Sequence, residues 1–138
     1  MIVQTLTTSF LVDMFEGLQS LTTDTIKMAL YTADANLTAN TTAYASTNEV
    51  TSANYTAGGA VCQNVTVNQS NGTVFVNFDN VSWTNVSFTC RGALIYNATK
   101  SGKSIAILNF GSDKIAGPNF VVTLPVNTVT TALIRSSF

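Results

Sequence analysis

The chain has 138 residues, of which only 9% are charged, with six Lys or Arg, seven Asp or Glu, no His and a formal net charge of -1. Globular proteins usually carry charge on about a quarter of their residues. Without a run of Lys or Arg, the chain lacks the cationic surface that binds phosphate backbones, so we expect no nucleic-acid partner. Without His, it lacks the usual general base and the commonest metal ligand, which disfavours enzymatic function. At this length we expect a single domain spanning residues 1–138.

Residues 1–20 are predicted to form an N-terminal arm and a short helix. Apolar side chains recur with a 3.6-residue period over residues 9–18, Ser9 or Thr8 can cap the first turn, and Gly17 weakens the far end. Isolated helices shorter than about 12–15 residues are marginal in water, so this helix needs a surface to pack on. Either its stripe covers an open end or edge of the domain, or it docks on a partner and leaves an apolar patch on the monomer. The stripe consists of Phe10, Leu11, Met14, Phe15 and Leu18.

The beginning of the chain does not look like a signal peptide. It has no basic segment, and the apolar run at residues 10–12 is interrupted by Asp13 and Glu16. No window approaches the roughly 20 apolar residues of a membrane span, so we expect synthesis in the cytoplasm and no membrane partner. The nine Asn-x-Ser/Thr triplets are therefore interpreted as a result of the Asn- and Thr-rich composition, although they match the acceptor motif of N-glycosylation.

A strand, a long loop and a turn are predicted next. Residues 25–31 alternate as a half-buried strand does, with Lys27 on the face opposite to the apolar side chains. Residues 33–52 contain few large apolar side chains and are predicted to form a long surface loop, the kind of segment that often makes contacts. Gly58 and Gly59 indicate a turn, because glycine adopts positive φ readily.

The rest of the chain reads as short strands separated by turns. Asn71-Gly72 between residues 60–67 and 73–78 is the strongest short-range signal for a β-hairpin. Further strands are predicted at residues 81–83, 86–90, 93–96, 104–110, 120–124 and 129–135, with breaks at Arg91-Gly92, 97–103 and 111–119. This spacing is typical of sandwiches and barrels. We therefore predict a mainly β protein, an antiparallel, jelly-roll-like β-sandwich with one short N-terminal α-helix.

The side chains suggest no catalytic, cofactor or metal site. The acidic residues are scattered, and residues 101–104 resemble the end of a phosphate loop without its preceding glycine or its following helix. Cys62 and Cys90 cannot form a four-ligand zinc site without His or clustered carboxylates nearby, and their apolar surroundings favour buried thiols, with a disulfide as the alternative. Oxygen-bearing residues at 34–40 have too little charge for a convincing calcium site. We expect no enzymatic activity and no cofactor.

A carbohydrate-binding module is a more serious alternative, because many such modules are β-sandwiches that stack sugars on exposed aromatic rings. Tyr31, Trp83 and Tyr96 lie in strand-like runs where burial is the default. Tyr44 and Tyr55 are the aromatic residues expected at the surface. Two tyrosines make a small platform for a sugar.

Eight stretches free of any catalytic signature, distributed over most of the chain, share their sequence character with one known class of proteins. They are residues 14–18, 24–32, 42–44, 47–50, 55–59, 83–89, 91–97 and 107–111. In these stretches the chain resembles small structural proteins of tailed bacteriophages. The resemblance implies a non-enzymatic capsid decoration, or cement, protein that stabilises the shell by bridging neighbouring capsid subunits. The alternative it implies is a tail or tail-fibre module that binds a host glycan or another tail protein.

Partners and contacts follow from this resemblance as expectations. The protein would be located in the virion, bind the major capsid protein, and contact neighbouring copies of itself as a homo-oligomer or lattice. Low charge suits close contact because neighbouring copies then repel one another little. The expected contact residues lie in the helix and near the long loop, namely Phe10, Leu11, Met14, Phe15, Tyr44 and Tyr55.

Overall fold

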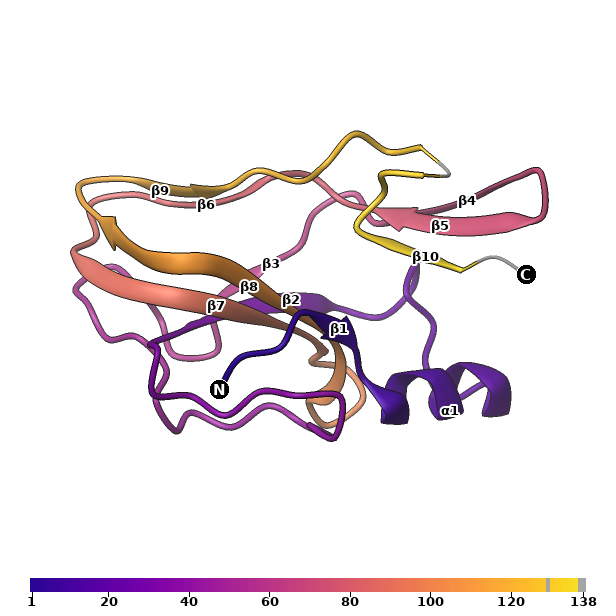
Figure 1. Cartoon of the computed structure of the whole chain (residues 1–138), viewed down its shortest axis with the longest axis horizontal. Coiled ribbons are helices and arrows are strands. Elements are labelled where there is room, and N and C mark those ends of the chain that lie inside the picture. Colours follow the sequence, from indigo (N-terminus) through magenta and orange to yellow (C-terminus); the bar gives the residue numbers. More distant parts are fainter. Residues whose placement is uncertain (129, 137–138) are drawn as a thin grey trace.

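Antiparallel strands in two layers make up most of the protein, shown in Figure 1 as a computed structural model that describes residues 1–128 and 130–136. The elements are, in chain order, β1 (Thr5–Leu6), α1 (Thr8–Glu16), β2 (Ile26–Tyr31), β3 (Ala60–Val61), β4 (Thr66–Ser70), β5 (Thr73–Asn77), β6 (Val81–Trp83), β7 (Phe88–Asn97), β8 (Lys103–Ala116), β9 (Phe120–Val122) and β10 (Ile134–Ser136). One layer is a five-stranded sheet of order β1-β8-β7-β2-β3. The other contains a three-stranded sheet, β10-β5-β4, and the pair β6-β9.

The predicted fold class is confirmed in its main terms. The strands pair in antiparallel fashion in every sheet, and a single short helix lies between β1 and β2 among the described residues. A large apolar core fills the space between the layers and includes Met28, Leu30 and Ile95. The packing is sandwich-like. The jelly-roll connectivity is not established by this strand order and stays a prediction.

Strand β2 is buried on both faces, so its predicted half-exposure is wrong. It lies between β7 and β3, and only Lys27 among its residues is partly exposed. Ala29 and Tyr31 belong to a second, smaller apolar cluster, to which the loop of residues 32–59 contributes Ala35 and Leu37. The loop thus covers the outer face of the sheet, and the alternation of β2 could not reveal that cover.

Strands β7 and β8 are longer than predicted because two glycines expected to break them lie inside them. At Gly92 a Cβ atom would lie 2.5 Å from the backbone oxygen of Leu108, so glycine allows close approach of neighbouring strands here. The register shifts between Cys90 and Gly92, where a bulge lets β7 continue. Gly111 has a φ of 82° and bends β8 without ending it.

The Asn71-Gly72 hairpin is confirmed. Both residues have positive φ, 51° and 78°, and Ser70 pairs with Thr73 across the turn, as expected for a two-residue hairpin loop. Residues 60–67, predicted as one strand, divide instead between β3 and β4, which belong to different sheets. Four other asparagines also adopt positive φ, namely Asn48, Asn54, Asn64 and Asn85.

The two cysteines are free and buried, as favoured from their apolar surroundings. Burial raises the pKa of Cys62 and of Cys90 to about 12, which makes both thiols poor nucleophiles. The last predicted strand, at residues 129–135, corresponds to β10, although Val129 itself lies outside the described residues.

Candidate functional site

Helix α1 is held by caps at both ends. The Oγ1 atom of Thr7 accepts a hydrogen bond of 3.3 Å from the backbone N–H of Phe10, so the N-cap is one residue earlier than predicted. Gly17 has a φ of 71°, and its N–H bonds back to the carbonyl groups of Asp13 and Met14, which is typical of a left-handed C-cap. The helix is therefore well defined although it is only nine residues long.

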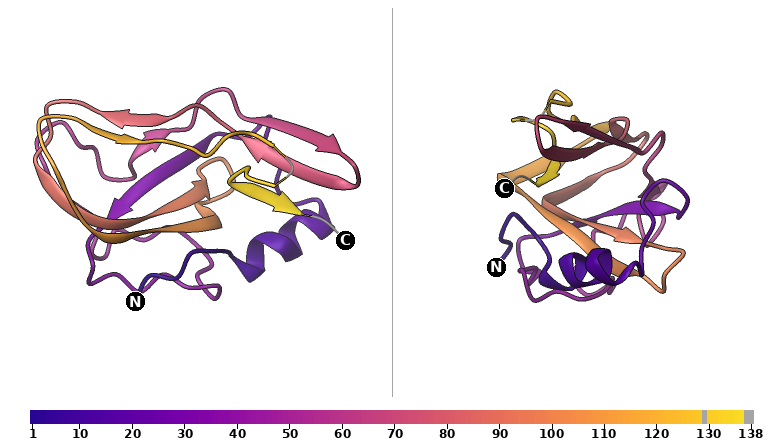
Figure 2. Two further views of the ribbon diagram at one scale, coloured as in Figure 1. Left: turned by 45° about the horizontal axis from the view of Figure 1, so that its top comes forward. Right: turned by 90° about the vertical axis from the view of Figure 1, so that its right-hand side faces the viewer.

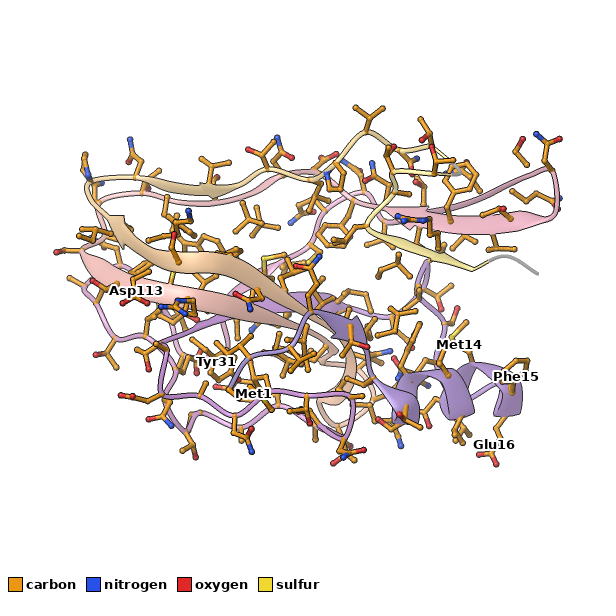
Figure 3. All side chains as sticks on the ribbon, viewed as in Figure 1. Met1, Met14, Phe15, Glu16, Tyr31 and Asp113 are labelled. Carbon is orange, nitrogen blue, oxygen red and sulfur yellow. The ribbon has the colours of Figure 1, made fainter. Side chains whose placement is uncertain are left out.

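The faces of α1 are reversed relative to the usual amphipathic arrangement. Its buried residues are Phe10 and Asp13, whereas the rest of the predicted apolar stripe is exposed. Phe15 protrudes most, with 87% of its surface accessible, and Figure 3 places it with Glu16 at the right-hand end of the molecule. The exposed large apolar residues here are Leu11, Val12, Met14 and Phe15 of the helix and Leu18 directly after its C-cap, and together they are called the α1 apolar face below.

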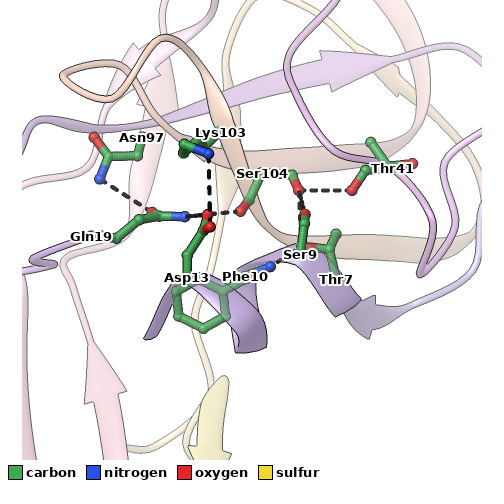
Figure 4. A network of polar contacts seen from close by, with 9 residues as sticks. All are labelled: Thr7, Ser9, Phe10, Asp13, Gln19, Thr41, Asn97, Lys103 and Ser104. Atoms are coloured by element: carbon green, nitrogen blue, oxygen red, sulfur yellow. Dashed lines mark hydrogen bonds and ion pairs between the residues drawn. The ribbon is translucent and has the colours of Figure 1, made fainter. Parts of the chain in front are cut away.

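A buried polar network explains why this helix turns a carboxylate inward (Figure 4). Asp13 accepts a hydrogen bond of 2.9 Å from Nε2 of Gln19, and the Nζ atom of Lys103 lies 3.7 Å from its other oxygen. Gln19 also donates to the carbonyl of Ser104 and accepts from the Nδ2 atom of Asn97 at 3.2 Å. These partners come from β7 and β8, so the network ties the helix to the sheet.

A second part of the network lies at the beginning of α1. The hydroxyl groups of Thr7 and Ser104 share a hydrogen bond of 2.8 Å, and both residues are fully buried. The Ser104 hydroxyl also contacts that of Ser9 at 3.1 Å and donates to the carbonyl of Thr41 at 2.7 Å. Ser104 therefore joins the helix, β8 and the long loop at one point.

This network fixes the direction in which the α1 apolar face points. A buried carboxylate without partners is strongly destabilising, whereas one with hydrogen-bond donors is tolerated. Among the described residues, the buried side-chain atoms without a partner belong to Asn77 and Asn127, outside this network. Rotating the helix to bury its apolar face would take Asp13 away from Gln19 and Lys103. The exposed apolar face is thus part of the folded arrangement.

The four expected contact residues on the helix differ in their exposure. Leu11, Met14 and Phe15 lie together on the α1 apolar face, which agrees with the alternative in which the helix leaves an apolar patch. Phe10 is 4% exposed and belongs to the main core, so it is not available for a contact with another molecule. Its ring is the one member of the predicted stripe that packs on the sandwich.

Tyr44 and Tyr55 lie away from the helix, and the expected exposure of Tyr55 is wrong. Its ring packs against Trp83 and Phe88 in the core, and its hydroxyl accepts a hydrogen bond from the backbone N–H of Leu30. Tyr44 is half-buried and stacks on Tyr96 with ring centroids 4.8 Å apart. The two rings therefore form no exposed platform for a sugar.

Glu49 is a buried residue that the sequence analysis missed. Its carboxylate accepts hydrogen bonds from the hydroxyl groups of Tyr44 and Tyr55, at 2.6 and 2.7 Å, and from the backbone N–H of Gly58 at 2.8 Å. Burial, reinforced by the nearby Glu49 charge, raises the pKa of Tyr96 to about 12 and that of Tyr44 and Tyr55 further. Glu49 is the one charged residue between Asp34 and Asp79, and that isolation was the available signal.

The described part of the chain brings no three His, Cys, Asp or Glu side chains close enough together to hold a metal ion. Among the described residues, no helix combines the length and the hydropathy needed to cross a lipid bilayer. Comparisons with protein-family models, curated proteins and solved structures find no match for this chain. The candidate site is the α1 apolar face, an exposed apolar surface that a buried polar network holds in place.

Proposed function

We propose that this protein is a non-enzymatic structural subunit of a virion, of the capsid decoration or cement type. It adds to a protein shell in many copies, and the α1 apolar face is its contact with a neighbouring subunit. The observation that carries the proposal is this face, which a buried polar network centred on Asp13 and Ser104 holds toward solvent.

The chemistry of the face suits a repeated contact between proteins. Burying one large apolar side chain stabilises a contact by about 1.5–3 kcal/mol, so the face supplies a modest interaction per copy. A ligand that binds only the assembled shell stabilises that shell by mass action, and many copies multiply the effect. Since only 9% of the residues are charged, neighbouring copies repel one another little at close range.

A tail or tail-fibre module that binds a host glycan is the second candidate. A hollow of about 450 Å³ within the loop of residues 32–59 supports it. Hydroxyl and amide side chains, including Asn36 and Thr42, line this hollow, and Asp34 is its only charged residue. Such a lining can hydrogen-bond the hydroxyl groups of a neutral sugar. The lining of this hollow shares no residue with the α1 apolar face, so the two candidates use different surfaces.

The copy number of the protein in purified virions separates the two candidates. We expect a number of copies comparable with that of the capsid subunit, measured by quantitative mass spectrometry of intact particles. A few copies per particle would support the tail module and overturn the decoration role.

The contact itself is tested by point substitution, because Phe10 lies in the core and a deletion of the helix would also disturb folding. Phe15→Asp should abolish binding to particles that lack the protein, while the far-ultraviolet circular dichroism spectrum stays unchanged. Ile115→Asp is the matched control, since Ile115 is also 87% exposed but lies on β8. Equal binding of Phe15→Asp and the wild-type protein would refute the role of α1.

A further inference from the structure

We propose that the α1 apolar face of one copy docks into an apolar hollow at the opposite end of a second copy, so that copies join head to tail. This assignment rests on the function proposed above and specifies the neighbouring subunit as another copy of the chain. Three features support it, namely the lining of the hollow, the charges beside the two surfaces, and their positions on the molecule.

The hollow has a volume of about 210 Å³ and lies between β8 and β9. A hollow of this size has room for a bulky side chain in place of several water molecules. Its floor is an aromatic cluster, in which Phe110 and Phe120 meet edge to face with centroids 6.0 Å apart and Phe120 packs on Phe88 in the same way. The lining residues are Phe110, Lys114, Phe120, Val121, Val122 and Thr123.

Phe15 is the side chain best placed to enter such a hollow. It is the most exposed apolar residue of α1, and Leu11 and Met14 lie beside it at helical spacing. Edge-to-face contact between a third phenylalanine ring and the Phe110–Phe120 pair would extend the existing aromatic cluster. Aromatic pairs of this geometry contribute about 0.5–1.5 kcal/mol beyond the burial of their area.

The charges beside the two surfaces are complementary. Glu16 follows Phe15 on the exposed side of α1, and Lys114 lines the hollow. The ion pairs among the described residues are Arg91–Asp113 and Lys103–Asp13, so both Glu16 and Lys114 are available to a second copy. A symmetric pairing of two α1 helices offers no such match, because α1 carries no basic residue.

The two surfaces lie at opposite ends of the molecule. In Figure 3, Phe15 and Glu16 lie at the right-hand end, whereas Asp113, the residue before Lys114, lies at the left-hand end. A contact between unlike surfaces leaves each pair of copies with one free helix and one free hollow. Such contacts produce a ring or an extended chain. Either outcome suits a layer that covers a shell.

The test uses two variants that each block one surface. Sedimentation velocity of the wild-type protein over a rising concentration series should show association beyond the dimer. Phe15→Asp places a charge on the α1 apolar face, and Val121→Asp places a charge in the hollow. Each variant therefore lacks one of the two contact surfaces and should remain monomeric on its own. Both residues are exposed, so both variants should fold. An equimolar mixture should form a dimer and nothing larger, because one intact helix and one intact hollow remain.

The proposed contact between Glu16 and Lys114 is tested by reversing each charge in turn and then both together. Glu16→Lys and Lys114→Glu should each weaken association about tenfold, which corresponds to about 1.4 kcal/mol, and the double variant should recover it. High salt should weaken the wild-type association, because the paired charges lie at the rim. Ile115→Asp, on the strand position next to Lys114 but directed to the other face of β8, should associate as the wild-type protein does.

Two results would overturn the head-to-tail contact. One is dimerisation of Val121→Asp alone, which would indicate helix–helix pairing. The other is a wild-type protein that stays monomeric up to millimolar concentration. Particle binding by such a monomer would leave the decoration role intact, whereas association in solution without particle binding would refute that role and keep the head-to-tail contact.

Discussion

Helix α1 and the first part of the loop of residues 32–59 lie on the same side of the five-stranded sheet, yet the helix and the loop bury opposite kinds of side chain (Figure 2). The loop is rich in Thr, Asn and Ala, and it directs its few large apolar residues inward, including Leu37, Val50 and Tyr55. The helix is rich in apolar residues, and it buries Asp13 while exposing most of them.

The difference shows that polar partners, rather than hydropathy alone, orient a short element on this sheet. The loop meets apolar side chains of β2, β7 and β8 and covers them. The helix meets the end of the β7–β8 hairpin, where Asn97, Lys103 and Ser104 offer polar contacts. Exposure of the α1 apolar face therefore reflects the polar composition of that hairpin end.

The largest loss of stability should come from substitution of Phe10, the one apolar residue on the buried side of α1. Phe10→Ala should lower the free energy of unfolding by about 3–5 kcal/mol, because it leaves a cavity in the main core. Urea denaturation followed by tryptophan fluorescence measures the change. Phe15→Ala on the exposed side should change stability by about 0.5 kcal/mol at most. Equal losses would mean that both faces of α1 are packed.

A smaller loss is expected at the carboxylate that orients the helix. Asp13→Ala removes the shorter of the two hydrogen bonds that the buried Gln19 amide donates, a bond to a carboxylate, and should lower the free energy of unfolding by about 1.5–3 kcal/mol. Glu16→Ala, which removes an exposed carboxylate from the same helix, is the control and should have little effect. If both variants unfold at the same urea concentration, the polar network does not hold α1 in place.

The loop is tested at one of its tyrosines. Tyr44→Phe removes the hydroxyl that donates to Glu49 and should lower the free energy of unfolding by about 0.5–1.5 kcal/mol. Hydrogen exchange should show the loss locally, at the Tyr44 amide that bonds to the carbonyl of Gly102. Thr47→Ala, at an exposed loop position, should leave this protection unchanged. Faster exchange confined to α1 would contradict this assignment.

The mildest test is alkaline titration. Cys62, Cys90 and Tyr96 have pKa values raised to about 12, so the folded protein keeps them protonated at a pH where the unfolded chain releases the protons. The unfolded values are about 8.5 for a thiol and 10 for tyrosine. Stability should thus be constant below about pH 8.5 and fall progressively toward pH 12. Thermal unfolding midpoints across this range provide the measurement, and a flat profile would contradict the burial of these groups.

Local patterns in the sequence predicted much of the fold. The helix, the Asn71-Gly72 hairpin and the long loop are all present, because each depends on residues close together in the chain. The extra burial of β2 and the continuation of β8 through Gly111 were missed, since both depend on segments far apart in sequence. Periodicity located the apolar stripe of α1.

Periodicity could not show which way that stripe points. The direction depends on partners distant in the chain, such as Gln19 and Ser104, which are separated by 85 residues. The same reasoning applies to Tyr55, whose buried position depends on Leu30, Glu49 and Trp83. Among the expected contact residues, three lie together on the helix because helical spacing alone brings them there.

The asparagines at positive φ have a practical consequence for engineering this chain. Solubility is often improved by placing more charged residues on the surface, with lysine as one choice. At the five positions in question the left-handed backbone conformation costs most residue types about 1–2 kcal/mol, and asparagine tolerates it because its side chain bonds locally. Lysine there would add charge and lose stability together. The exposed Thr66 in β4 is a better position for such a change, and the asparagines to be left in place are Asn48, Asn54, Asn64, Asn71 and Asn85.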